Sequence, residues 1–193
     1  MQNNNTKNKE KSQGMNNNIK KTVIMALYIA IFVVLSIYGT IRFGDYKLTV
    51  QNLPIYLVAI SLGAIPGAIV GFTGMLLNQM ITYGFQATTL FWVLPQTILG
   101  AICGYIFEND YVKVSSTKKF FVTIIALQIV VTFLNTIASV VDALIYGYFN
   151  FFIVFGPLII RLMLSIMTGV ILCIIIPIII KRTKKYIDSM IKS

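Results

Sequence analysis

The sequence predicts an all-α membrane protein, a bundle of six transmembrane helices in which the second helix is short and the first extracellular loop is extended. Of its 193 residues, 57% are hydrophobic and only 11% are charged, against roughly 25% charged residues in an ordinary globular domain. The hydrophobic residues form long runs that basic residues flank. Within one run, Gly63, Gly67 and Gly71 recur every fourth residue, a spacing that lets helices pack closely in a bilayer.

The composition argues against an enzyme and against a metal site. The chain has no histidine, which is the commonest general base and metal ligand. Its two cysteines, Cys103 and Cys173, lie in separate apolar runs without CxxC spacing. We therefore expect no catalytic residue, no cofactor and no bound metal. The net charge of +10 comes from residues beside apolar segments, which favours membrane orientation over nucleic-acid binding.

The ends of the chain are expected to lie outside the membrane domain. Residues 1–19 are polar and rich in Asn and Lys, which predicts a disordered cytoplasmic tail rather than a signal peptide. The six-helix membrane domain is expected over residues 20–183, followed by a basic cytoplasmic tail over residues 184–193. The first helix, over residues 20–38, carries Ala26 and Ala30 four residues apart, a spacing typical of close helix packing.

The segment after the first helix does not have a helical pattern. Residues 39–51 alternate in polarity around Gly44 and Asp45, which predicts a short hairpin or an extended loop outside the membrane. The next helix begins at residue 52 or 53 and ends near residue 63. Its roughly 11 residues span about 16 Å, about half of a hydrocarbon layer of roughly 30 Å. Non-helical backbone at membrane depth is tolerated only against protein or a water-filled cavity, so we expect a cavity near this loop.

Four further helices are predicted. A third helix is predicted to begin at Pro66, because proline is favoured in the first turn of a helix, and to end near Gly84. The fourth helix covers residues 90–107, with Trp92 near the interface where aromatic residues gather. The fifth covers residues 120–146 and the sixth residues 152–180.

The basic residues predict the orientation, because cytoplasmic loops carry an excess of Lys and Arg. With both termini in the cytoplasm, Arg42 and Lys47 lie outside and Arg161 lies within the span. The inner side then holds 13 of the 16 basic residues, namely Lys7, Lys9, Lys11, Lys20, Lys21, Lys113, Lys118, Lys119, Lys181, Arg182, Lys184, Lys185 and Lys192.

Polar residues inside the predicted helices share one depth in this topology, the outer half of the membrane. They are Asn78, Gln79, Trp92, Gln96, Asn135, Asp142 and Arg161. A charge in lipid costs about 2.5 to 3.5 kcal/mol on insertion scales, so Arg161 requires a partner or a solvated pocket. One interpretation is an Arg161–Asp142 pair that pins the last two helices, with the amides as interhelical hydrogen bonds. The other is a pocket, open to the outside, for a small anionic or heteroaromatic solute, with Trp92, Tyr83 and Tyr146 as stacking candidates.

The sequence contains no evident means of driving transport. It lacks a Walker A loop for ATP and an intramembrane chain of acidic residues for proton relay. A partner protein is therefore expected to supply the energy.

The chain resembles the substrate-binding S component of an energy-coupling factor (ECF) vitamin transporter. The resemblance covers residues 20–183 and rests on six helices with a short second one, on Ala26 and Ala30, on the Asn-Leu-Pro of residues 52–54, and on the sequence LGAIPGAIVGF of residues 62–72. The run IRFGDYKLTVQNLPI is most similar to the folate-type subgroup, with pantothenate transporters as near neighbours. Ala64 replaces a proline that many relatives have, and the residue sets expected for riboflavin, thiamine or biotin are not recognised.

The resemblance implies a high-affinity subunit in a bacterial cell membrane that captures a vitamin from outside. Its implied partners are a transmembrane coupling subunit and two cytoplasmic ATPases. Arg42 and the FGDYK stretch would form a lid over the bound vitamin. The implied substrate-binding residues are Arg42 and the seven outer-half residues named above, and the residues of the subunit interface are Ala26, Ala30, Gly63, Gly67 and Gly71.

Two alternatives remain open on the residues alone. One is a self-sufficient secondary transporter of a small solute, and the other is a structural or sensory membrane protein whose polar residues only join helices. The most informative single observation would be the identity of any small molecule that co-purifies with the protein.

Overall fold

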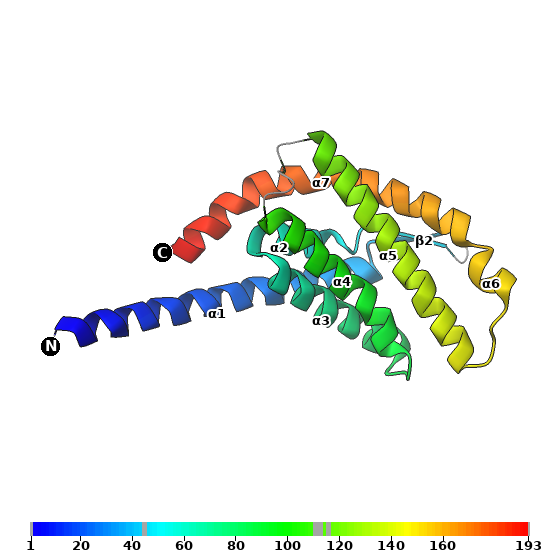
Figure 1. The fold of residues 1–193 in the computed structure, drawn as a ribbon, viewed down its shortest axis with the longest axis horizontal. Helices are drawn as coiled ribbons and strands as arrows, with labels where there is room; N and C mark the ends of the chain where they lie inside the picture. Colours follow the sequence, from blue (N-terminus) through cyan, green and yellow to red (C-terminus); the bar gives the residue numbers. More distant parts are fainter. Residues whose placement is uncertain (1, 44–45, 110–113, 115–116, 193) are drawn as a thin grey trace.

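Long apolar runs become helices in lipid because a helix satisfies every backbone polar group within its own segment. The computed structural model describes residues 2–43, 46–109, 114 and 117–192, with side chains described for residues 18–41, 48–109, 114, 118–152 and 154–183. Figure 1 shows its elements, which are α1 (Gln2–Ile37), β1 (Thr40–Phe43), β2 (Tyr46–Thr49), α2 (Leu53–Leu62), α3 (Ala64–Tyr83), α4 (Thr89–Glu108), α5 (Thr117–Ile145), α6 (Phe151–Phe155) and α7 (Leu158–Lys192).

Five of the described helices are long and apolar enough to cross a membrane: α1, α3, α4, α5 and α7. Helix α2 is short, as expected, and its ten residues span about 15 Å. The described chain is therefore a mostly helical membrane protein with five candidate crossings. A sixth crossing through α2 stays a prediction.

Both ends of the chain are helical where tails were expected. Helix α1 begins at Gln2, although its candidate membrane span begins at Asn18. Helix α7 continues to Lys192, beyond a candidate span that ends at Thr183. Once a helix has formed, each added residue gains a backbone hydrogen bond, so both helices extend into polar sequence. In Figure 1 the two ends project from the same side of the bundle.

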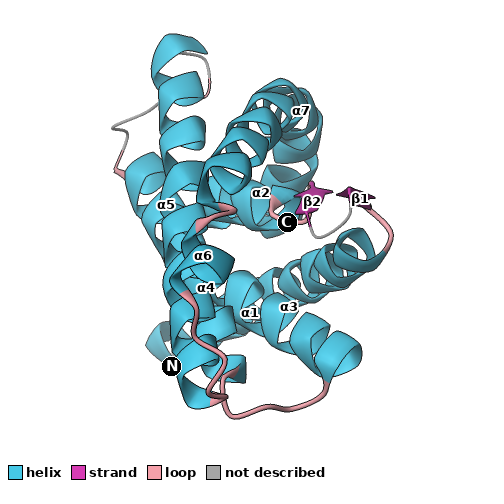
Figure 2. Ribbon diagram, turned by 90° about the vertical axis from the view of Figure 1, so that its right-hand side faces the viewer, coloured by secondary structure: helices cyan, strands magenta, loops and turns pink. Residues whose placement is uncertain are grey.

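The first loop forms the expected hairpin. Strands β1 and β2 pair antiparallel, with Thr40 opposite Thr49 and Ile41 opposite Leu48. The hydroxyl of Thr40 donates a hydrogen bond of 3.2 Å to the hydroxyl of Thr49. The Gly44-Asp45 turn and the side chain of Arg42 lie outside the described residues. In Figure 2 the hairpin lies beside α7.

Helices α2 and α3 are separated by a sharp turn at Gly63. Its φ of 96° is in the region that only glycine adopts readily. Helix α3 begins at Ala64, two residues before the expected start at Pro66. The Ala64 backbone N–H donates to the Glu108 carboxylate at 3.3 Å, which satisfies one of the free donors at the start of a helix.

The glycine-rich face of α3 packs inside the subunit, which corrects the expectation that it docks a partner. A Cβ atom added at Gly67 would lie 2.7 Å from Ala59 Cβ and 2.8 Å from the Gly100 carbonyl oxygen, and one added at Gly71 would overlap the backbone of Gln96. Both glycines are buried, because α4 and α2 already occupy this face. Gly63, at the turn, has the Glu108 carboxylate beside it.

The expected sixth helix is divided into two. Helix α6 ends at Phe155 and α7 begins at Leu158, after Gly156 and Pro157. Proline disfavours helical backbone at the residue before it and cannot donate to the preceding turn. Arg161 is therefore the fourth residue of α7 and not the tenth residue of a longer helix that begins at residue 152.

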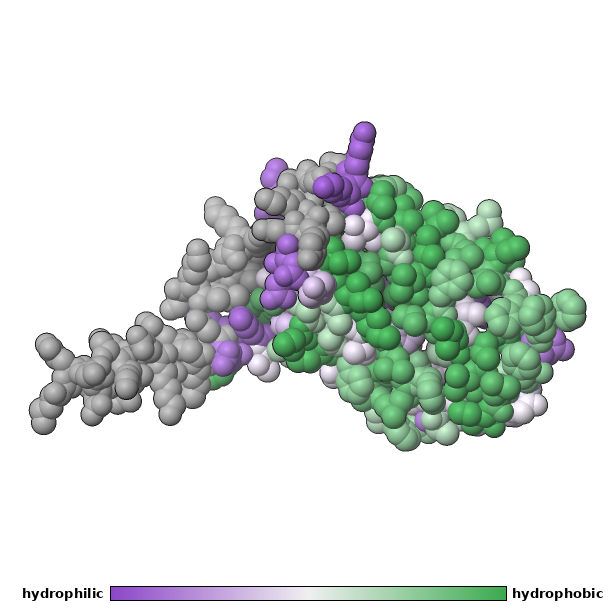
Figure 3. All heavy atoms as spheres, viewed as in Figure 1, coloured by the Kyte–Doolittle hydropathy of each residue, from purple (hydrophilic) through white to green (hydrophobic). Residues whose placement is uncertain are grey.

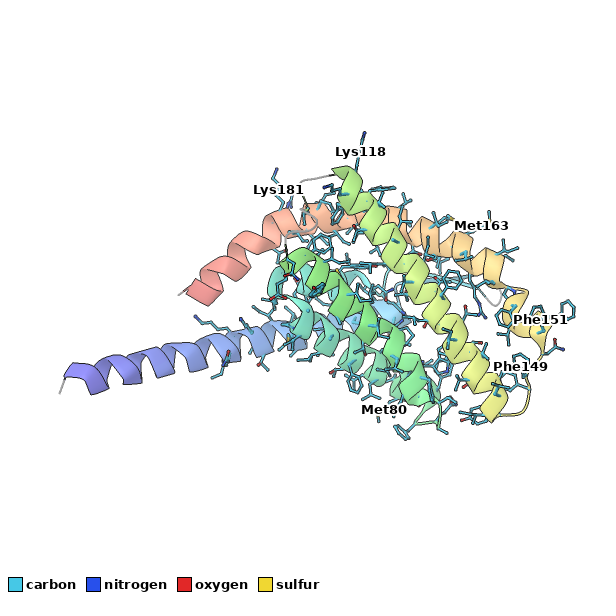
Figure 4. All side chains as sticks on the ribbon, viewed as in Figure 1. Met80, Lys118, Phe149, Phe151, Met163 and Lys181 are labelled. Atoms are coloured by element: carbon cyan, nitrogen blue, oxygen red, sulfur yellow. The ribbon has the colours of Figure 1, made fainter. Side chains whose placement is uncertain are left out.

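The surface separates into an apolar belt and two distinct ends. Figure 3 shows hydrophobic residues over most of the bundle in this view, with hydrophilic ones gathered beside the projecting helix ends. In Figure 4, Lys118 and Lys181 lie at that end, and Phe149 and Phe151 lie at the opposite one. The belt fits a lipid environment, and the orientation of the bundle in the membrane stays a prediction.

Candidate solute-binding cavity

A cavity of about 600 Å³ opens among the helices, within the size range of small-molecule sites. The end of α1, the hairpin, the start of α2, and helices α3, α4, α5 and α7 contribute to its wall. The lining residues are Ser36, Ile37, Thr40, Thr49, Gln51, Asn52, Met75, Asn78, Gln79, Thr82, Tyr83, Gln86, Trp92, Gln96, Gln128, Val131, Thr132, Asn135, Asp142, Arg161, Leu164, Ser165 and Thr168. Most of them carry a hydrogen-bonding group, unlike the apolar core elsewhere in the bundle.

Helices α5 and α7 each present one polar face to the cavity. On α5 the lining residues include Gln128, Thr132 and Asn135. On α7, Arg161, Ser165 and Thr168 follow the same helical spacing. Residues three, four and seven positions apart lie on one side of a helix, so each helix turns its polar side inward and its apolar side toward lipid.

Helix α4 places two lining residues one turn apart, the half-buried indole of Trp92 and the buried amide of Gln96. The Gln96 side chain is only 1% exposed. Its backbone contacts Gly71 of α3 directly. The close approach of α3 and α4 therefore fixes the position of Gln96 in the wall.

Asp142 organises one end of the cavity by accepting three hydrogen bonds. The donors are the Thr88 hydroxyl at 2.5 Å, the Trp92 indole N–H at 3.4 Å, and the hydroxyl of Tyr148. The bond to Asp142 raises the pKa of Tyr148 to about 12, so this hydroxyl keeps its proton at neutral pH and remains a donor. These contacts tie the start of α4 to the end of α5.

Arg161 lines the same cavity but does not form an ion pair with Asp142. Within the described part of the chain, no carboxylate lies within ion-pair distance of its guanidinium, and the Asp142 carboxylate binds three neutral donors instead. Arg161 lies in the first turn of α7, where the helix dipole is positive. This wall of the cavity is electropositive and can receive an anionic or electron-rich group.

Several buried polar atoms of the cavity wall have no hydrogen-bond partner among the described residues. They are Asn52 Oδ1, Gln96 Oε1, Gln128 Nε2 and Ser165 Oγ. A buried polar group without a partner costs about 1 to 3 kcal/mol, so native proteins rarely leave several together. Their clustering at one cavity is typical of a site whose ligand completes the hydrogen bonding.

The structure brings together seven of the eight residues that the sequence assigned to substrate binding. Asn78, Gln79, Trp92, Gln96, Asn135, Asp142 and Arg161 all line the cavity, although that they bind a substrate stays a prediction. The eighth, Arg42, has its backbone in β1, and its side chain is not described. Of the other stacking candidates, Tyr83 lines the cavity, whereas Tyr146 lies after α5 at an exposed position.

Four further polar residues line the cavity that the sequence analysis does not assign to the site: Asn52, Gln128, Ser165 and Thr168. Of these, only Asn52 is named in the sequence analysis above, as part of the Asn-Leu-Pro motif. The spacing of Ser165 and Thr168 from Arg161 by four and seven residues was the signal that would have found them.

The expected subunit interface on α1 lies apart from the cavity. Ala26 and Ala30 are exposed at the surface of α1 and do not line the cavity. The described neighbours leave this face open, so a role in docking a partner stays a prediction.

Comparisons with known proteins agree with this architecture. A family model described as ECF-type riboflavin transporter, S component, matches residues 16–185. A UPF0397 protein of Onion yellows phytoplasma (strain OY-M) is 31% identical over 134 residues, which cover 67% of this chain and 71% of that protein. The family match does not confirm the folate-type subgroup, to which the hairpin sequence was most similar.

Proposed function

Because the chain belongs to the family of ECF-type riboflavin transporter S components, we propose that it is the high-affinity substrate-binding subunit of an ECF-type importer that captures a vitamin or related micronutrient from outside the cell. The observation that carries this proposal is the cavity, where amide, hydroxyl and guanidinium groups from five helices meet inside an apolar bundle. If these groups served only to join helices, they would be expected to bond to one another. Several of them instead lack a partner among the described residues and surround a cavity of about 600 Å³.

The cavity favours a planar solute that carries polar substituents. Trp92 and Tyr83 line it and offer aromatic faces for stacking. Arg161 supports binding of an acidic or electron-rich substituent. Riboflavin, named in the description of the family, is the first compound to test. Folate-type and pantothenate-type compounds remain candidates because of the hairpin sequence.

We place the cavity toward the outside of the membrane and both termini in the cytoplasm. Lys118 and Lys181 at one end of the bundle (Figure 4) support this orientation. In this topology α2 and the hairpin form the sixth passage. Asn52, before α2, lines the cavity, and Gly63, after it, lies beside Glu108 at the end of α4.

Delivery of the solute to the cytoplasm requires partners. We assign this role to an ECF transmembrane coupling subunit with two ATPase subunits, because the chain contains no ATP-binding loop. The exposed Ala26 and Ala30 of α1 form the docking surface that we assign to the coupling subunit.

The binding test uses Trp92, the single tryptophan of the chain, as a built-in probe. Riboflavin, folate, thiamine and pantothenate are added in turn to the purified protein without ATP. One of them is expected to quench the Trp92 fluorescence and raise the unfolding temperature, with nanomolar affinity. Absence of a response to every compound would contradict the proposal.

Two companion measurements separate the remaining possibilities. Right-side-out membrane vesicles should bind the active compound and inside-out vesicles should not, and the reverse result would refute the orientation. Accumulation of the compound in cells that lack every coupling subunit would identify a secondary transporter instead.

A further inference from the structure

At one end of the cavity wall, two buried amides from distant parts of the chain form a pair. Asn52 lies at the start of α2 and Gln128 on α5, and their side chains are 6% and 4% exposed. The Asn52 Nδ2 group donates to Gln128 Oε1 at 3.4 Å. Asn52 Oδ1 and Gln128 Nε2 remain without a partner among the described residues.

We infer that this Asn52–Gln128 pair recognises a heteroaromatic ring edge that presents an N–H donor beside a hydrogen-bond acceptor. The inference rests on the proposed function and narrows the class of its substrate. The pair offers one free carbonyl oxygen and one free NH₂ group, so its complement is one donor and one acceptor side by side.

The donor and acceptor roles of the pair do not depend on how the amides are oriented. The oxygen and nitrogen of an amide are assigned from the hydrogen-bond network. If both side chains were turned over, Gln128 would donate to Asn52, and the pair would still leave one NH₂ group and one carbonyl oxygen. Because both unpaired atoms are buried, binding requires a rotation about each terminal torsion, which is a soft one, to turn them toward the ligand.

Other common chemical groups match the pair less well. A carboxylate supplies only acceptors, so it would satisfy Gln128 Nε2 but face the oxygen of Asn52. An ammonium group supplies only donors and would face the NH₂ group of Gln128. An apolar group would leave both atoms unpaired in a region of low dielectric.

The surroundings of the pair fit a flat ring. Gln96 on α4 brings another unpaired acceptor, Oε1, to the cavity wall, and Trp92 lies one turn away on the same helix. On α7, Ser165 adds a hydroxyl that can donate or accept. A planar heterocycle with polar edges satisfies such a set, whereas a flexible aliphatic acid does not.

The test removes the pair and follows two quantities, ligand affinity and the stability of the free protein. The full-length double variant Asn52→Leu/Gln128→Met and the single variant Gln128→Met are compared with wild type, using riboflavin, folate, thiamine and pantothenate as probes. Both variants should bind the active compound at least about tenfold more weakly, because a site built to hydrogen-bond a group discriminates strongly when that bond is lost. The unfolding temperature of the free double variant should stay near wild type, because both partners are removed together.

A matched pair of ligands tests the same contact from the other side. If riboflavin binds, 3-methylriboflavin, in which the ring N–H is blocked, should bind at least about tenfold more weakly. The difference in affinity between riboflavin and 3-methylriboflavin should be smaller in the double variant than in wild type. The control is Thr97→Val, since the Thr97 hydroxyl bonds to Val93 of its own helix outside the cavity lining, and it should bind as wild type does.

The outcomes separate this inference from the proposed function. Unchanged affinity with a lower unfolding temperature in the double variant would make the pair a structural link only and overturn the inference. Wild-type binding of pantothenate alone, which has no such ring edge, would also overturn it while leaving the proposed function intact. If no compound binds wild type, the result contradicts both the proposed function and this inference.

Discussion

Asp142 illustrates how one side chain can join two segments at the mouth of a site. Its carboxylate accepts from Thr88 and Trp92 of the α4 start and from Tyr148 after α5. Hydrogen bonds to a charged acceptor are roughly twice as strong as neutral ones. These donors, and not Arg161, are the partners of Asp142 among the described residues.

Replacing Asp142 with Asn should destabilise the protein by about 1 to 3 kcal/mol, because the charge-assisted bonds become neutral ones and one amide donor faces other donors. The change is measured by thermal unfolding in detergent. Because Trp92 bonds to Asp142, its emission spectrum should shift as well. Thr183→Val is the control, since the Thr183 hydroxyl donates to the Ile179 carbonyl of its own helix. An unchanged unfolding temperature and emission would show that the Asp142 contacts do not hold the two segments.

At the scale of elements, the glycines of α3 and α4 decide how closely two helices approach. Gly67 and Gly71 on α3 lie against Gly100 and the backbone of Gln96 on α4. In a membrane, such small residues let packing forces act over a long contact. The same contact positions Gln96 in the cavity wall, so helix packing and the candidate site are coupled.

Gly71→Leu should therefore weaken both stability and binding. Overpacking costs typically about 1 to 3 kcal/mol, and a displaced Gln96 should lower the affinity for the active compound. Unfolding temperature and Trp92 quenching measure the two effects. The control Ile65→Phe adds bulk on the same helix at a position that is 75% exposed and should change neither. If Gly71→Leu instead kept stability and affinity but lost a partner subunit, the glycine face would be a docking surface after all.

At the scale of the whole molecule, three surfaces have separate chemistry. They are an apolar belt (Figure 3), an end that carries Lys118 and Lys181 (Figure 4), and a polar cavity. The exposed side of α1 belongs to the belt, yet it carries two alanines in place of larger side chains. Small residues on a lipid-facing helix favour close contact with another helix. The docking assignment for Ala26 and Ala30 follows from this combination.

Ala26→Trp should abolish co-purification with a coupling subunit, because the indole keeps the two helices apart. Affinity for the active compound should stay as in wild type, since α1 contributes to the cavity only near its other end, at Ser36 and Ile37. Ile174→Trp is the matched control, because Ile174 is 61% exposed on a different helix, α7. Equal co-purification of both variants would reject the assignment.

Much of the fold was predictable from the sequence because its signals are local. The long apolar runs, the antiparallel pairing of the strands in the first loop, and the short helix before Gly63 all agree with the structure. That the polar residues of different helices share one cavity was predictable as a group property, since each polar side chain in lipid is costly. Their depth in the membrane stays a prediction. The break at Pro157 had a local signal too, but the surrounding apolar run outweighed it in the prediction.

The amino-acid sequence by itself determined a membrane protein and most of its helices, because hydrophobic length acts on each segment separately. It also singled out polar residues that line the cavity, because an unpaired polar group in lipid is costly. Only the tertiary structure decided that the glycine face packs on α4, that Asp142 binds Thr88 and not Arg161, and that Asn52 meets Gln128. These outcomes depend on contacts between residues far apart in the chain, and in a bilayer such contacts are selected by shape and hydrogen-bond geometry rather than by hydrophobicity.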